Sequence, residues 1–195
     1  MKVSKLLLAT NNAKKVEEIR KIGPLGCELL TLEEVDFKEE IPETTNTIVG
    51  NSLQKAQYVF DRLGMDCLSD DSGLEINALN GKPGVDSAHY AGLPPNHLRN
   101  IDRVLRELNF QANREARFVT VLTLLLKGNV FQFEGEIKGT IAKTPLGNNG
   151  FGYDPIFIPL GYDQTFAQMD PEEKNKISHR ALALQKLKDF LKSQE

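Results

Sequence analysis

The stretch of sequence that most restricts the fold of this chain is 68–76, in which two adjacent aspartates, Asp70 and Asp71, interrupt an otherwise apolar run. The apolar residues on either side are typical of a strand, and a charged pair is costly to bury unless it is paired or holds a metal. Successive side chains on a strand point to opposite faces. We therefore expect the two carboxylates to have different partners and different tasks. The alternative is a turn in which both aspartates are solvated or cap the backbone.

The remaining segments predict a mixed α/β fold. Strand-like runs alternate with helical spacing of apolar residues in the first half of the chain, which is typical of α/β proteins. The second half opens with two runs that predict an antiparallel hairpin. We therefore expect a central mixed β-sheet with flanking helices, and a single domain spanning 1–195. The expected strands are 3–9, 27–32, 68–76, 116–126 and 130–137, and the expected helices are 13–22, 47–63, 96–108 and one that begins at Ser178.

Charge and cysteine content exclude several classes of protein. A formal net charge of −3 argues against a general nucleic-acid binder, which would show a basic excess. Cys27 and Cys67 are far apart and form neither a disulfide framework nor a zinc motif, which suits a reducing cytoplasm. The N-terminal apolar run is too short for a signal peptide, and no run reaches transmembrane length. We expect a soluble, cytoplasmic protein with no nucleic-acid or membrane partner.

The turn after the first expected strand is the first of four polar elements that bear on function. A strand, a polar turn and a helix N-terminus together form a layout that binds phosphate through backbone N–H groups. Two lysines add positive charge there, although the GxxxxGK[ST] motif of a Walker A loop is absent. A capped helix with a solvated first turn is the alternative. The residues of this turn are Thr10, Asn11, Asn12, Ala13, Lys14 and Lys15.

The other three elements indicate a metal-dependent nucleotide site. Carboxylates without cysteine or neighbouring histidine ligands favour Mg²⁺ over zinc, and the lysines favour a polyphosphate. An aromatic side chain in a glycine-rich loop offers a stacking face for a base. Together they indicate a Mg²⁺–nucleoside triphosphate site in which a carboxylate activates water. The three elements are Glu43 with Asp71, the segment Phe151, Gly152, Tyr153 and Asp154, and Lys174 with His179 and Arg180.

The pair His179 and Arg180 stands at the expected start of the last helix. Helix N-termini favour anions, so two cations in the first turn are electrostatically unusual. An anionic ligand that joins the two side chains would explain them. The alternative is that both are merely exposed.

Five stretches resemble the motifs of the inosine/xanthosine triphosphate pyrophosphatase family, the Ham1-like enzymes that act on non-canonical purine nucleotides. They occur in the family's order, with its spacing, over essentially the whole chain. The stretches are Thr10–Lys15, Ser69–Gly73, Gly81–Gly84 followed by Ser87-Ala88, Gly150–Pro155, and Glu173-Lys174 with Ser178-His179-Arg180.

The resemblance implies hydrolysis of ITP, dITP and XTP between the α- and β-phosphates, which gives a monophosphate and pyrophosphate and cleanses the nucleotide pool. It implies two lobes around an active-site cleft, a homodimer, and Asp71 as a general base that also contacts Mg²⁺ together with Glu43. Phe151 would stack on the base and Asp154 would accept from its ring N–H, while His179 and Arg180 donate to it. Lys174 is assigned to the phosphate or ribose end. The other implied substrate-binding residues are Thr10, Asn11, Asn12, Ala13, Lys14, Lys15, Ser72, Gly152 and Tyr153.

The sequence departs from the family pattern at three positions. Asn11 replaces a glycine, His89 replaces the arginine of S-A-R-Y, and Gly50 replaces the glutamate of E-N-A-x-x-K-A. Because Gly50 offers no carboxylate, the metal would rely on Glu43, and Gly50→Glu would lower the Mg²⁺ requirement. Two rival functions are a catalytically silent nucleotide-binding protein and a phosphatase that releases orthophosphate. The presence of Asp71 argues against the silent protein.

Overall fold

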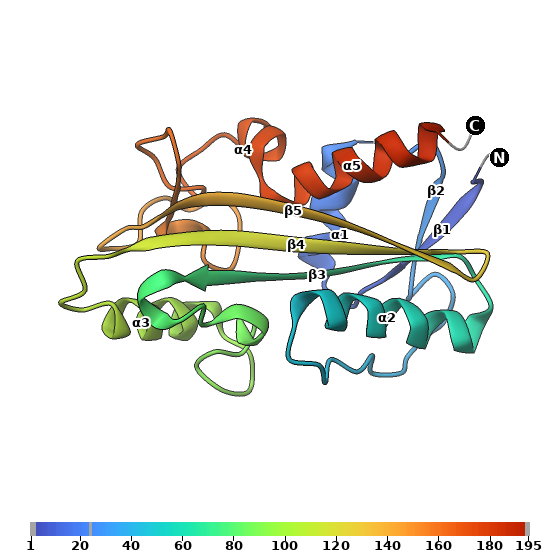
Figure 1. The fold of residues 1–195 in the computed structure, drawn as a ribbon, viewed down its shortest axis with the longest axis horizontal. Helices are drawn as coiled ribbons and strands as arrows, with labels where there is room; N and C mark the ends of the chain where they lie inside the picture. The colour runs from blue at the N-terminus through green and yellow to red at the C-terminus, as the bar shows by residue number, and fades with distance from the viewer. Residues whose placement is uncertain (1–2, 24, 194–195) are drawn as a thin grey trace. The chain divides into compact units, whose positions relative to one another are not determined.

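A computed structural model of the chain describes residues 3–23 and 25–193, and these contain five α-helices and six strands (Figure 1). The strands belong to one sheet in which hydrogen-bonded neighbours follow the order β2-β1-β3-β4-β5-β6. The pairs β1–β2 and β1–β3 are parallel, whereas β5–β6 is antiparallel, so the predicted mixed α/β fold is confirmed. The strands are β1 (Lys5–Ala9), β2 (Glu28–Thr31), β3 (Cys67–Ile76), β4 (Glu115–Leu126), β5 (Asn129–Ile141) and β6 (Phe157–Pro159). The helices are α1 (Ala13–Ile22), α2 (Ile48–Leu63), α3 (His97–Glu107), α4 (Pro171–Ile177) and α5 (His179–Ser193).

The chain divides into two compact units, each with its own core. The first unit consists of Met1–Asp71, Thr120–Gly135 and Arg180–Glu195. The second unit consists of Ser72–Val119 and Glu136–His179. The strands β3, β4 and β5 contribute residues to both units.

In the first unit, helices cover both faces of the strands. Leu6 and Leu8 of β1 pack in one cluster with Leu184 of α5, whereas Leu7 packs in another with Val59 of α2. Figure 1 shows α2 and α5 on opposite sides of these strands. Because successive side chains of a strand alternate between faces, a continuous apolar run fills both layers. This explains why β1 shows no polar alternation.

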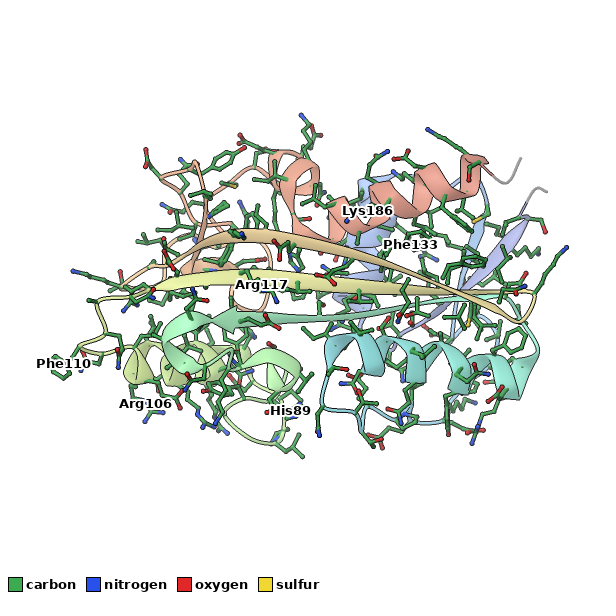
Figure 2. The ribbon with its side chains drawn as sticks, in the orientation of Figure 1. His89, Arg106, Phe110, Arg117, Phe133 and Lys186 are labelled. Atoms are coloured by element: carbon green, nitrogen blue, oxygen red, sulfur yellow. The ribbon has the colours of Figure 1, made fainter. Side chains whose placement is uncertain are left out.

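Where α5 meets β5 in the first unit, the contact is aromatic. The ring of Phe190 lies 4.5 Å from that of Phe131 and 5.4 Å from that of Phe133, measured between centroids. Lys186, labelled with Phe133 in Figure 2, donates from Nζ to the carbonyl of Glu134 at 2.8 Å. Polar and apolar contacts together dock the helix on the strand.

In the second unit, α3 packs its apolar face against β3 and β4. The buried residues are Ile101, Val104 and Leu108, whereas Leu98 is 66% exposed. The buried apolar stripe therefore begins at Ile101, one turn after Leu98. Phe110, just beyond α3, is 98% exposed and points away from the strands in Figure 2.

Local signals in the sequence account for several ends of elements. The side chains of Asn12, Thr47, Asn96 and Asp170 accept hydrogen bonds from backbone N–H groups at the starts of α1, α2, α3 and α4. Two residues with positive φ, Lys127 and Gly128, join β4 to β5, as a tight hairpin turn requires. Within 3–23 and 25–193, no helix combines the length and apolarity that crossing a bilayer would need.

Candidate functional site

The two aspartates of β3 are buried on a strand, so the alternative of a solvated turn is wrong. Asp70 is 1% exposed and Asp71 is 5% exposed. Asp70 pairs with Lys15 and Arg180, whereas Asp71 pairs with Lys55. As expected for neighbours on a strand, the two carboxylates have different partners.

The Asp70 carboxylate lies in a buried ionic network. Its Oδ2 accepts from Nε of Arg180 at 2.7 Å, and its Oδ1 contacts Nη2 of Arg180 at 3.3 Å and Nζ of Lys15 at 2.7 Å. Arg180 also binds the carboxylate of Glu18 through Nη1. Burial alone would raise the pKa of Asp70, but Arg180 and Lys15 outweigh it and hold that pKa well below the usual range. Asp70 is therefore a charged anchor inside the first unit.

These contacts show what surrounds Arg180 in the first unit. The side chain is buried, so the alternative of an exposed arginine is wrong. The anions that join it are carboxylates of the protein itself, Asp70 and Glu18. Nε and Nη2 of the guanidinium contact Asp70, and Nη1 contacts Glu18. In the structure, Arg180 supports Asp70, and a contact of Arg180 with the base stays a prediction.

The Asp71 carboxylate belongs to a different group, centred on an ammonium. Nζ of Lys55 lies 2.8 Å from Oδ1 of Asp71 and 3.2 Å from Oε1 of Glu43. Lys55 is buried, whereas the Glu43 side chain is 48% exposed. Burial raises the pKa of Asp71 even though Lys55 is beside it. A buried carboxylate with a raised pKa is suited to accept a proton.

The donor set around Lys55 fits a hard divalent cation. Asp71 and Glu43 supply carboxylate oxygens within reach of one centre, the ammonium that they share. Among the described residues, no group of three or more His, Cys, Asp or Glu side chains is placed to hold a metal. Mg²⁺ is usually bound by one or two carboxylates and keeps several waters, so two carboxylates are sufficient.

Gly50 lies in the first turn of α2, close to this group in the sequence. A Cβ atom at position 50 would lie 2.5 Å from Oγ1 of Thr45 and 2.8 Å from Oγ1 of Thr47. The substitution Gly50→Glu would therefore displace neighbouring residues as well as add a carboxylate. Gly50→Glu would therefore not only add a metal ligand, as the sequence suggested, but also disturb Thr45 and Thr47.

The side chain of Asn12 caps the start of α1 and occupies backbone N–H groups that were expected to bind phosphate. Oδ1 of Asn12 accepts from the backbone N–H groups of Lys14 and Lys15 at 3.1 and 3.2 Å. Lys14 is exposed and pairs with Glu17 at 3.5 Å, whereas Lys15 reaches Asp70. Of the two lysines, only Lys15 lies with the carboxylates of β3. Contacts of Thr10, Asn11, Asn12, Ala13 and Lys14 with substrate stay predictions.

The glycine-rich segment forms a second polar group, inside the second unit. Oδ2 of Asp154 accepts from the backbone N–H of Phe151 at 2.8 Å and from Nζ of Lys174 at 2.7 Å. That ammonium lies 5.4 Å from the centre of the Phe151 ring, within the range of a cation–π contact. Gly150 has a φ of 74°, and a Cβ there would collide with the Asp154 carboxylate. The structure thus places Lys174 with Phe151 and Asp154 inside the second unit.

The remaining predicted residues have varied surroundings. Tyr153 is buried, and its hydroxyl donates to the carbonyl of Ser87 at 2.9 Å. The imidazole of His179 is buried and stacks on Phe118, with centroids 4.7 Å apart and planes 9° apart. Gly152 has a φ of 62° and nothing within 4 Å of a Cβ at that position. Substrate contacts of Ser72, Gly152 and His179 stay predictions.

Comparison with known proteins identifies the family. A sequence model described as the Ham1 family matches residues 6–190. The chain belongs to the Ham1 family. The dITP/XTP pyrophosphatase of Flavobacterium johnsoniae is 48% identical over 187 residues, which cover 96% of this chain and 97% of that protein. The dITP/XTP pyrophosphatase of Bacillus subtilis is 44% identical over 191 residues, 96% of each chain. The solved Ham1 protein of Staphylococcus aureus has a TM-score of 0.90 at 35% identity and covers 98% of this chain and 100% of its own.

Three residues of this Ham1 family member escaped sequence reasoning. Lys55 was not singled out, although it interrupts a stripe of small and apolar residues on α2 that includes Ala56 and Val59. A lysine within such a stripe is a signal for a buried ion pair. Glu18 lies beside Ile19 on the buried part of α1 and gave a similar signal. Phe118 gave none, because an apolar residue in a strand is expected in any core.

Proposed function

We propose that this Ham1 family member hydrolyses non-canonical purine nucleoside triphosphates, namely dITP, XTP and ITP, to the monophosphate and pyrophosphate. The names of its relatives support the reaction over almost the whole chain. One structural observation carries the proposal: Asp71 is buried with a raised pKa beside Lys55, and Glu43 binds the same ammonium. This group provides a proton acceptor and oxygen ligands in one place.

Asp71 is the proposed catalytic residue. Its carboxylate would orient and deprotonate the water that attacks the α-phosphate. Asp71 and Glu43 would hold Mg²⁺, which when bound supplies positive charge to the phosphate oxygens. Lys55 keeps both carboxylates in place, and Lys15 adds positive charge on the Asp70 side of the strand.

The second unit carries the proposed base-recognition residues. Phe151 offers the stacking face, and Asp154 and Lys174 offer an acceptor and a donor beside it. Hypoxanthine and xanthine present a carbonyl at position 6 where adenine presents an amino donor. A site whose donors pair with this carbonyl leaves those donors unpaired when adenine binds. The unpaired donors weaken the binding of adenine several-fold relative to that of hypoxanthine and xanthine. The stack of His179 on Phe118 holds the imidazole of His179 in one orientation, in which it would donate to the base.

Phe151→Ala tests the stacking role. We expect the KM for dITP to rise on the order of tenfold, because stacking of one base on an aromatic ring contributes roughly 1–3 kcal/mol. The rate at saturating substrate should change much less. Steady-state kinetics on dITP and XTP measures both, and the matched control is Phe110→Ala, which removes a ring that is 98% exposed. An unchanged KM for Phe151→Ala would contradict the assignment.

Product analysis tests the reaction itself. The protein is incubated with dITP, XTP and ATP in the presence of Mg²⁺, and pyrophosphate, orthophosphate and nucleoside monophosphate are quantified. Pyrophosphate with monophosphate, formed much faster from dITP and XTP than from ATP, supports the proposal. Release of orthophosphate indicates a phosphatase, and absence of products indicates a silent binding protein.

Three further properties belong to the proposal. We propose that the two units form one domain spanning 1–195, that the enzyme is a homodimer, and that it acts in the cytoplasm on the free nucleotide pool. The first is tested by cooperative unfolding of the whole chain, and the second by sedimentation at several protein concentrations. A role in keeping deaminated purines out of DNA and RNA follows from the proposed substrates.

A further inference from the structure

The segment that carries Glu43 is fastened to α2 by two side-chain amides. Gln54 binds Thr44 twice, because Oε1 accepts from its backbone N–H and Nε2 donates to its hydroxyl, both at 2.8 Å. Oδ1 of Asn51 accepts from the backbone N–H and the hydroxyl of Thr45 at 3.0 and 2.8 Å. Four hydrogen bonds therefore hold the two residues that directly follow Glu43.

Capping of the helix does not explain these bonds. The N-cap of α2 is Thr47, whose Oγ1 accepts from the backbone N–H of Gly50 at 3.0 Å. Gln54 lies in the second turn of the helix, where backbone N–H groups already have partners within the helix. Its amide has no capping task, yet it matches both the donor and the acceptor of Thr44.

Gly50 is the residue that allows the segment to lie this close. The hydroxyl of Thr45 occupies the space in which a side chain at position 50 would begin, since a Cβ there would lie 2.5 Å from that oxygen. The same hydroxyl hydrogen-bonds the carbonyl of Thr47 at 3.0 Å. A Cβ atom at position 50 would require the side chains of Thr45 and Thr47 to shift.

We propose that Gln54 and Asn51 are positioning residues for Glu43, and that Gly50 is required for their action. The inference rests on the proposed function, in which Glu43 and Asp71 hold the divalent cation. Glu43 is half exposed and follows Pro42 in a stretch without regular structure, so its carboxylate would otherwise sample many positions. The two amides fix the backbone from which it reaches Lys55, and this lowers the entropy lost when the cation binds.

The test measures binding of Mn²⁺ alone to the full chain, followed by the electron paramagnetic resonance of the free ion. We expect Glu43→Gln and Gln54→Ala each to weaken binding about tenfold, the size of effect seen when a partner of a metal ligand is removed. The double variant should bind as weakly as Glu43→Gln and no more weakly. The control is Gln57→Ala, in the same helix, whose amide contacts exposed Asp61 at 2.7 Å and which should bind like the wild type.

Each outcome bears on one of the two proposals. If Glu43→Gln weakens binding and Gln54→Ala does not, the positioning role is refuted and the metal site stands. If Gln54→Ala weakens binding equally in the Glu43→Gln background, it acts by another route and the inference fails. If Glu43→Gln has no effect, the proposed metal site is wrong and the inference falls with it. Gly50→Ala is the second variant, and it should weaken binding only while Glu43 is present.

Discussion

Asp71→Asn is expected to lower turnover of dITP by about 10²- to 10⁴-fold, the contribution typical of a positioned general base. The amide keeps the shape of the side chain but cannot accept the proton of the attacking water. The substitution also removes the negative charge of the carboxylate that pairs with Lys55. Initial rates of pyrophosphate release, measured with circular dichroism of the same samples, separate lost chemistry from lost folding.

Asp70→Asn is the informative comparison for this variant. Asp70 is the neighbouring residue on β3, but its carboxylate is committed to Arg180 and Lys15. The substitution should lower the free energy of unfolding more than Asp71→Asn does, and lower turnover less in the protein that remains folded. Near-normal turnover in Asp71→Asn would remove this residue from the chemistry.

Arg180→Ala is expected to lower the free energy of unfolding by about 3–5 kcal/mol, the usual cost of leaving buried carboxylates without their partner. Two buried carboxylates lose that partner, Asp70 and Glu18. For a chain of this length the melting temperature should fall on the order of 10 °C. Urea denaturation and thermal melting measure the two quantities.

The ratio of dITP to ATP turnover decides between the two roles of Arg180. If Arg180 only supports Asp70, the substitution should leave the ratio of dITP to ATP turnover unchanged in the folded protein. If Arg180 contacts the base, the substitution should lower that ratio. Lys186→Ala is the control, because Lys186 lies on the same helix and binds the carbonyl of the exposed residue Glu134. A stable Arg180→Ala protein with altered selectivity would restore the role that the sequence suggested.

Much of the fold was predictable because its signals are local. Asn12, Thr47, Asn96 and Asp170 start helices through hydrogen bonds within a few residues of themselves. The hairpin between β4 and β5 needs only a turn with positive φ at Lys127-Gly128. A continuous apolar run then indicates a strand that is buried on both faces, and an alternating run indicates a strand that is buried on one face. The exposure of Leu98 was not predictable, because periodicity gives the buried face of a helix but not the residue at which its packing against the sheet begins.

The candidate site was only partly predictable, because its decisive contacts join distant parts of the chain. Asp70 and Asp71 stood out by their chemistry, but Arg180 meets Asp70 across 110 residues of sequence. No local pattern reports such a partner. Lys174 was assigned to the phosphate end for the same reason, and its contact with Asp154 became visible only in three dimensions. The consequence of Gly50 also depended on knowing where Thr45 lies.

The ammonium of Lys55 acts as a resident counter-ion for Asp71 and Glu43. Without it, two carboxylates aimed at one point would repel each other whenever the cation is away. We therefore expect the chain to fold without the proposed metal, unlike proteins whose ligands come together only around zinc. A chelator should abolish turnover by the proposed enzyme while the protein stays folded, and readdition of Mg²⁺ should restore turnover without refolding. If Mg²⁺ is the metal, as proposed, the protein would stay folded but inactive wherever Mg²⁺ is scarce.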